Sequence, residues 1–142
     1  LWVEVYIESE NTYDTAFFEV VNAANAAANQ MSMKHQNSNN SMYIMRNGGG
    51  VNDDIQTGTS SLPKGSWVTV GITWSVGRET YDFAASTNKG SNWTAQNDGI
   101  ATMANAPDTL RCGNLTFSSN NSQGYRINRW AVVSGWQGAC PW

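Results

Sequence analysis

Residues 66–75, Ser-Trp-Val-Thr-Val-Gly-Ile-Thr-Trp-Ser, decide the fold class through the alternation of their side chains. Apolar residues at a period of two indicate a β-strand with one buried face, because successive side chains point to opposite faces of a sheet. The expected inner side consists of Val68, Val70, Ile72 and Trp74. We therefore predict a central strand whose other side carries Trp67, Thr69, Gly71 and Thr73.

The same period recurs along the chain, beginning with Leu1, Val3, Val5 and Ile7 on one side of residues 1–8. Residues 22–29 are rich in Ala and Asn, and we expect a loop or a single helical turn there. In the last long strand, Ile127 and Arg129 are expected to share one face. Short strands with turn signals between them predict an all-β antiparallel sandwich or barrel. The further expected strands are residues 16–21, 31–34, 41–46, 53–56, 80–86, 93–96, 109–112 and 124–133.

Length and composition exclude several classes of protein. The chain has 142 residues, so we expect a single domain over 1–142. Apolar residues make up 40%, enough for a core, so we expect no disorder. The formal net charge is −3 and no basic face is evident, so we expect no nucleic-acid binding. No apolar stretch is long enough to span a membrane, so we expect no membrane partner. The chain begins at Leu1 and stops abruptly at Trp142, so we expect a piece of a longer or processed chain.

Four segments resemble the concanavalin A-like lectin/glucanase superfamily, which includes the laminin-G-like domains. They are Lys64–Trp74, Tyr81–Ser86, Ala106–Gly113 and Gly124–Val132, and the match covers roughly residues 60 to 136. Their residue patterns are most similar to those of modules in bacteriophage tail, fibre and head-decoration proteins. The resemblance implies a jelly roll of two curved sheets.

The resemblance also implies where such a module works and what it contacts. We expect a non-catalytic module on the virion surface or otherwise extracellular, in contact with other virion proteins or copies of itself, with possible binding of a neutral host glycan. The alternatives are a polysaccharide-active glycoside hydrolase or lyase, and a carbohydrate-binding module of a secreted enzyme. The fold alone does not choose among them, because one fold hosts many functions.

Catalytic candidates are few, and we predict no catalytic residue. β-Glucanases of the superfamily carry a Glu-x-Asp-x-Glu pattern, and the sequence has Glu4 and Glu8 with Tyr6 in place of the middle Asp. We expect both carboxylates on the solvent-facing side of an outer strand. His35 is the sole histidine and would have to serve any Ser-His-Asp triad. Its Asn/Ser-rich surroundings predict an exposed side chain instead.

Metal and disulfide candidates leave alternatives open. Asp53, Asp54 and Asp98 could join backbone carbonyls around Ca²⁺, but the spacing of a calcium loop is missing and paired Asp are typical turn formers. We therefore predict no metal and no required cofactor, with Ca²⁺ as the alternative. Cys112 and Cys140 are either a disulfide or two free thiols, depending on the redox compartment.

The seven tryptophans are the most suggestive feature for binding. Trp67, Trp74 and Trp130 fall within expected strands, and we interpret them as anchors in the core or on a sheet face. An exposed Trp flanked by amides and hydroxyls can stack on a sugar ring, whereas a buried one would cover the end of the sandwich. The predicted ligand-binding residues are Asn92, Trp93, Gln96, Asn97 and Trp136.

Overall fold

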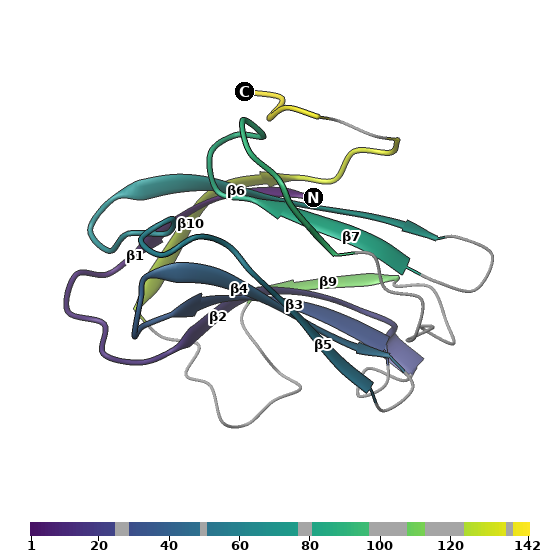
Figure 1. Ribbon diagram of the computed structural model, residues 1–142, viewed down its shortest axis with the longest axis horizontal. Helices are drawn as coiled ribbons and strands as arrows, with labels where there is room; N and C mark the ends of the chain where they lie inside the picture. The colour runs from purple at the N-terminus through teal and green to yellow at the C-terminus, as the bar shows by residue number, and fades with distance from the viewer. Residues whose placement is uncertain (25–28, 49–50, 77–80, 97–107, 113–123, 136–137) are drawn as a thin grey trace.

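The structure is a computed structural model. It consists of two antiparallel five-stranded β-sheets that face each other as two layers (Figure 1). The structure describes residues 1–24, 29–48, 51–76, 81–96, 108–112, 124–135 and 138–142. Within these, only the backbone is described for residues 29–30, 45–48, 51–54, 74–76, 81–83 and 95–96. The prediction of an all-β chain with antiparallel sheets is confirmed.

The first sheet has the strand order β10-β1-β6-β7-β8, and the second has the order β5-β4-β3-β2-β9. The first sheet consists of β1 (Trp2–Ile7), β6 (Trp67–Val76), β7 (Tyr81–Ser86), β8 (Thr94–Gln96) and β10 (Tyr125–Ala131). The second consists of β2 (Thr15–Val21), β3 (Asn29–Gln36), β4 (Ser41–Gly48), β5 (Val51–Gln56) and β9 (Thr109–Cys112). Of the segment 22–29, residues 23–24 form a 3-10 turn and 25–28 lie outside the described residues.

The core lies between the inner faces of the two sheets, as the period of two predicts. Val3, Val5 and Ile7 of β1 are fully buried, and Val70 and Ile72 of β6 lie beside them. Burying each of these side chains contributes about 1.5–3 kcal/mol relative to leaving it exposed. The second sheet contributes Phe17, Phe18, Val20, Met31, Met33, Met42, Ile44 and Ile55 to the same cluster.

The two sheets contact each other on both sides of the core. On one side, the ring of Trp130 in β10 lies 6.1 Å from the ring of Phe18 in β2. On the other side, the edge strands β5 and β8 approach each other. Residues at the end of an edge strand can line a hollow that neither sheet fills.

A β-bulge between Glu4 and Val5 changes which residues of β10 point outward. Val5 pairs with Ile127, whereas Glu4 pairs with Arg129, so the alternation shifts by one residue between them. The expectation that Ile127 and Arg129 share a face is therefore wrong. The shift brings the guanidinium of Arg129 over the outer face, where its Nε lies 3.0 Å from a carboxylate oxygen of Glu4.

Trp2 lies on the outer face of the first sheet and is covered there by other parts of the chain. Trp2 points outward, as its position in the alternation requires, yet it is only 3% exposed. Its ring occupies the space above Gly71, where a Cβ atom would lie 2.5 Å from the ring. The Trp93 ring packs edge-on against it, with 5.5 Å between centroids.

The C-terminal segment, residues 138–142, runs over this outer face beside the β7–β8 loop (Figure 1). Trp93 Nε1 donates a 3.1 Å hydrogen bond to the carbonyl of Gly138, and the Cys140 amide donates one of 3.0 Å to the carbonyl of Lys89. The Trp142 ring lies 4.8 Å from the guanidinium of Arg129. The segment therefore holds the β7–β8 loop against the sheet.

We expect Gly71→Ala to lower the free energy of unfolding by about 1–3 kcal/mol, because the added methyl group has no room beneath the Trp2 ring. Urea denaturation followed by tryptophan fluorescence measures the change. Gly58→Ala is the matched control, because a Cβ atom at Gly58 meets nothing within 4 Å. Equal losses in the two variants would show that Trp2 can move aside without cost.

Candidate functional site

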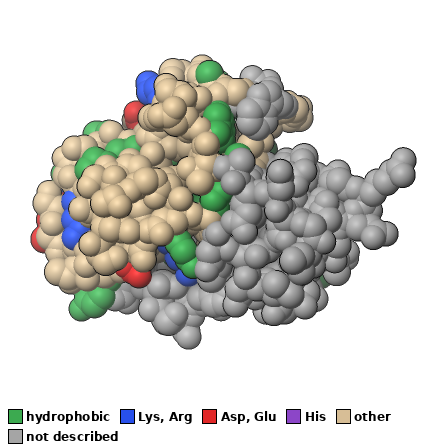
Figure 2. All heavy atoms as spheres, viewed as in Figure 1, with side chains coloured by type: hydrophobic (Ala, Val, Ile, Leu, Met, Phe, Trp, Pro, Cys, Tyr) green, Lys and Arg blue, Asp and Glu red, His purple; other side chains and the backbone are tan. Residues whose placement is uncertain are grey.

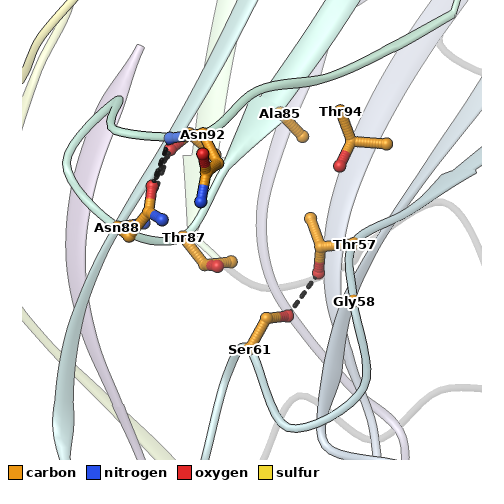
Figure 3. Close-up of a pocket in the computed structure, with 9 residues that line it drawn as sticks. Thr57, Gly58, Ser61, Ala85, Thr87, Asn88, Asn92 and Thr94 are labelled. Carbon is orange, nitrogen blue, oxygen red and sulfur yellow. Dashed lines mark hydrogen bonds between the residues drawn. The ribbon is translucent and has the colours of Figure 1, made fainter.

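A polar pocket of about 200 Å³ lies where the edges of the two sheets approach each other, beside the ends of β5 and β7 and the start of β8 (Figure 3). The described lining carries no charged side chain and is dominated by hydroxyl and amide groups. It consists of Thr57, Gly58, Ser61, Ala85, Ser86, Thr87, Asn88, Asn92 and Thr94.

One wall of the pocket is the turn that follows β5. The Thr57 hydroxyl accepts a 2.9 Å hydrogen bond from the Met42 amide and donates one of 3.1 Å to the Met42 carbonyl. Ser61 Oγ lies 2.5 Å from the same hydroxyl oxygen. The backbone amides of Ser60 and Leu62 donate to carbonyls of the β3–β4 turn. This wall is therefore held by hydrogen bonds within the protein itself.

The opposite wall is the β7–β8 loop, which is folded around the Ser86 hydroxyl. That hydroxyl accepts a 3.0 Å hydrogen bond from the Gly90 amide and lies 3.0 Å from Asn88 Oδ1. Asn88 Oδ1 also accepts a 2.9 Å hydrogen bond from the Asn92 amide (Figure 3). Positive φ angles at Lys89 and Gly90 let the chain reverse tightly here.

Three side chains in the pocket retain their hydrogen-bonding capacity. Within the described part of the chain, the hydroxyls of Thr87 and Thr94 and the side-chain amide of Asn92 form no hydrogen bond. Thr94 and Thr57 lie on one side of the hollow, and Thr87 and Asn92 lie across from them on the loop (Figure 3). These groups can both donate and accept hydrogen bonds, but none of them can act as a strong acid, base or nucleophile without a partner.

The structure places the predicted ligand residues unevenly. Asn92 lines the pocket. Trp93 does not, because its ring packs on Trp2 and its N–H is bonded to Gly138. Gln96 ends β8 with only its backbone described, and Asn97 and Trp136 lie outside the described residues.

The carboxylates Glu4 and Glu8 form ion pairs across the edge of the first sheet. Asn128 and Arg129 lower the pKa of Glu4, and Arg126 lowers the pKa of Glu8. Arg126 binds both carboxylate oxygens of Glu8, at 2.5 and 2.9 Å. A glycosidase requires the opposite shift in one carboxyl, because its general acid must stay protonated. This geometry favours a role in holding β10 to β1.

His35 is fully buried, so the prediction of an exposed histidine is wrong. The strand β3 continues to Gln36, which places His35 inside the sheet in register with Thr15 and Met42. Its Nε2 lies 3.1 Å from Asn40 Oδ1, and its Nδ1 has no hydrogen-bond partner among the described residues. Burial lowers the pKa of the imidazole, so the ring is neutral near pH 7.

Neither cysteine forms a disulfide in the structure. Cys112 is exposed at the end of β9 in the second sheet. Cys140 lies on the outer face of the first sheet, where its amide bonds to Lys89. Both are free thiols in the structure, so it shows the second of the two alternatives.

Among the residues with described side chains, no group of three or more His, Cys, Asp or Glu could hold a metal ion. For Asp53 and Asp54 only the backbone of β5 is described, and Asp98 lies outside the described residues. The calcium alternative therefore stays a prediction.

Charged side chains are sparse on the visible described surface, and most of that surface is backbone and neutral polar atoms (Figure 2). The described ranges contain no helix with the length and apolar character needed to cross a membrane. Comparison with protein-family models, curated proteins and solved structures finds no match to this chain. The resemblance to concanavalin A-like and bacteriophage modules stays a prediction.

Sequence reasoning missed most of the pocket. Thr57 and Ser61 lie in a polar segment, Thr-Gly-Thr-Ser-Ser, that reads as an ordinary turn. Ser86 and Thr87 precede the predicted ligand residues in sequence, and Thr94 lies among them without being one of them. No pattern along the chain links the two segments, because only the approach of β5 to β8 joins them.

We expect the stability advantage of the wild type over His35→Gln to shrink as the pH falls from about 7 to about 5.5. The folded state resists protonation of His35, whereas the unfolded chain takes up the proton near pH 6.5, so acid favours unfolding. Glutamine preserves a donor toward Asn40 without titrating. Urea denaturation at several pH values measures both proteins, and their shared titrating groups cancel in the difference. A constant difference would mean that His35 titrates alike in both states.

Proposed function

We propose that this chain is a non-catalytic binding module whose pocket takes an uncharged ligand rich in hydroxyl groups, the chemistry of a neutral glycan. The observation that carries the proposal is the composition of the pocket. Seven of its nine described lining residues offer a hydroxyl or an amide, namely Thr57, Ser61, Ser86, Thr87, Asn88, Asn92 and Thr94.

The physical argument rests on matching donors and acceptors. A sugar hydroxyl both donates and accepts, and so do the free groups of Thr87, Asn92 and Thr94. An ionic ligand would lose its hydration in this pocket without meeting an opposite charge among the described lining residues, which is costly. The internally bonded walls support binding as well, because little conformational entropy is lost on ordering them.

We also propose that the two sheets form a jelly-roll sandwich of the concanavalin A-like type. Support comes from the adjacent first and last strands, β1 and β10, and from the motif-bearing segments that form β6, β7, β9 and β10. On this proposal the module works on a virion surface or another extracellular surface. The low content of charge supports contacts with other virion proteins or copies of itself through shape and hydrogen bonding.

The test of the binding proposal is a glycan array of neutral mono- and oligosaccharides, followed by titration calorimetry with the strongest binder. We expect Thr87→Val and Thr94→Val each to weaken binding by about fivefold to tenfold, because each removes one hydroxyl at nearly constant volume. Valine keeps the β-branched shape that suits the local backbone.

The matched control is Thr59→Val, which removes a hydroxyl from the exposed neighbouring turn but not from the pocket lining. It should bind like the wild type. Equally strong binding by the wild type and all three variants would show that the ligand does not bind in the pocket. A protein that binds no sugar on the array would overturn the proposed ligand class.

A further inference from the structure

A second surface with ligand-binding character lies on the outer face of the first sheet. Tyr6 pairs with Arg126 on one side and with Trp67 on the other, so these three side chains cross three neighbouring strands in a single row. We call Arg126, Tyr6 and Trp67 the aromatic row. The C-terminal segment covers the outer face around Trp2 and Trp93, at the other end of β1.

The aromatic row is ordered yet open to solvent. The rings of Tyr6 and Trp67 have centroids 5.5 Å apart at an interplanar angle of 54°. The guanidinium of Arg126 lies 4.9 Å from the centroid of the Tyr6 ring. Trp67 is nevertheless 48% exposed. An indole held by its neighbours and half open to water offers an apolar contact at little entropic cost.

Arg126 and Arg129 beside the aromatic row each pair with a carboxylate, and Glu10 is a further acidic residue whose charge acts on Arg126. Arg126 is bonded to both carboxylate oxygens of Glu8, and Arg129 is paired with Glu4 on the next rung of the sheet. An anionic or cationic partner would therefore meet no unmatched charge in these pairs. Arg126 uses Nε and Nη2 for Glu8, which leaves N–H groups of its guanidinium to donate elsewhere.

We propose that the aromatic row is a binding surface for a neutral polysaccharide chain. A sugar ring stacks its C–H face on the indole of Trp67, and its hydroxyls accept hydrogen bonds from Arg126 and contact the Glu8 carboxylate. The ligand class fits because a sugar ring has an apolar C–H face and a rim of hydroxyls. The aromatic row offers an apolar indole for the face, and the Arg126–Glu8 ion pair lies nearby for the hydroxyls.

A protein partner is less well matched to this surface. Stable protein interfaces bury about 800 Å² per partner around an apolar centre. Apart from Tyr6, the surroundings of Trp67 on this face are polar, with Thr69 two residues along β6 and the two ion pairs beyond Tyr6 and Glu4. One indole in polar surroundings suits a narrow chain of sugar rings better than a broad protein surface.

This inference takes its ligand class from the proposed function, but it does not involve the pocket. The pocket is lined from the ends of β5 and β7, whereas the aromatic row lies on the outer side of β1, β6 and β10. Substitutions in one place therefore leave the other intact, and the two proposals fail separately.

The test is affinity electrophoresis of the whole chain in native gels that contain neutral polysaccharides, namely β-glucan, dextran, mannan and xylan. We expect at least one polymer to retard the wild type, and we expect Trp67→Ala to weaken that binding by at least about tenfold through loss of stacking and apolar contact. Trp67→Phe should retain most of the binding, because it keeps an aromatic face.

The matched control is Trp130→Ala, which removes a tryptophan of similar exposure, 52%. Trp130 pairs with Val3 and therefore lies on the inner face of the sheet, away from the aromatic row. This variant should be retarded like the wild type, and circular dichroism checks that every variant is folded. Equal retardation of Trp67→Ala and the wild type would overturn the aromatic row while leaving the pocket untouched. A wild type that no polymer retards would also overturn it, whatever the short sugars do in the pocket.

Discussion

The packing of Trp2 over Gly71 is the contact on which the pocket end of the molecule depends. It requires a residue without a side chain on β6, because a Cβ atom there would lie 2.5 Å from the ring. The Trp2 ring in turn supports Trp93, whose N–H binds the carbonyl of Gly138. Through these contacts the first strand, the β7–β8 loop and the C-terminal segment become one unit. The loop that forms a wall of the pocket is therefore held from behind by aromatic packing and from within by Ser86 and Asn88.

The scarcity of charge acquires a structural meaning when the ion pairs are placed. Glu4 and Glu8 are matched with Arg129 and Arg126, and these pairs join β10 to β1 across the bulge. Glu19 is likewise buried against Arg111 in the second sheet. Charges used in this way strengthen the pairing of strands and leave the open surfaces to hydroxyls, amides and aromatic rings. Such surfaces suit neutral ligands, because no desolvated charge has to be compensated on binding.

Much of the fold could be predicted, and the site could be predicted only in part. The burial of Val3, Val5 and Ile7 could be predicted from the period of two, because side chains alternate between the two faces of any strand. His35 was misjudged because β3 extends past the point where polar residues suggested a turn. Arg129 was misjudged because a bulge between Glu4 and Val5 shifts the alternation, and this bulge arises in the pairing of strands that lie about 125 residues apart in sequence. Asn92 was found from the local density of amides around Trp93, but its partners across the pocket were not.

The sequence by itself determined the all-β class, the buried side of β1 and the low content of charge, because these depend on each residue and its near neighbours. Only the tertiary structure decided which tryptophans are open. Trp67 remains half exposed beside Tyr6, whereas the Trp93 ring packs on Trp2 and its N–H donates a hydrogen bond to the Gly138 carbonyl. It also decided that Thr57 and Thr94 face one hollow, since β5 and β8 belong to different sheets whose edges meet only after both have packed on the common core.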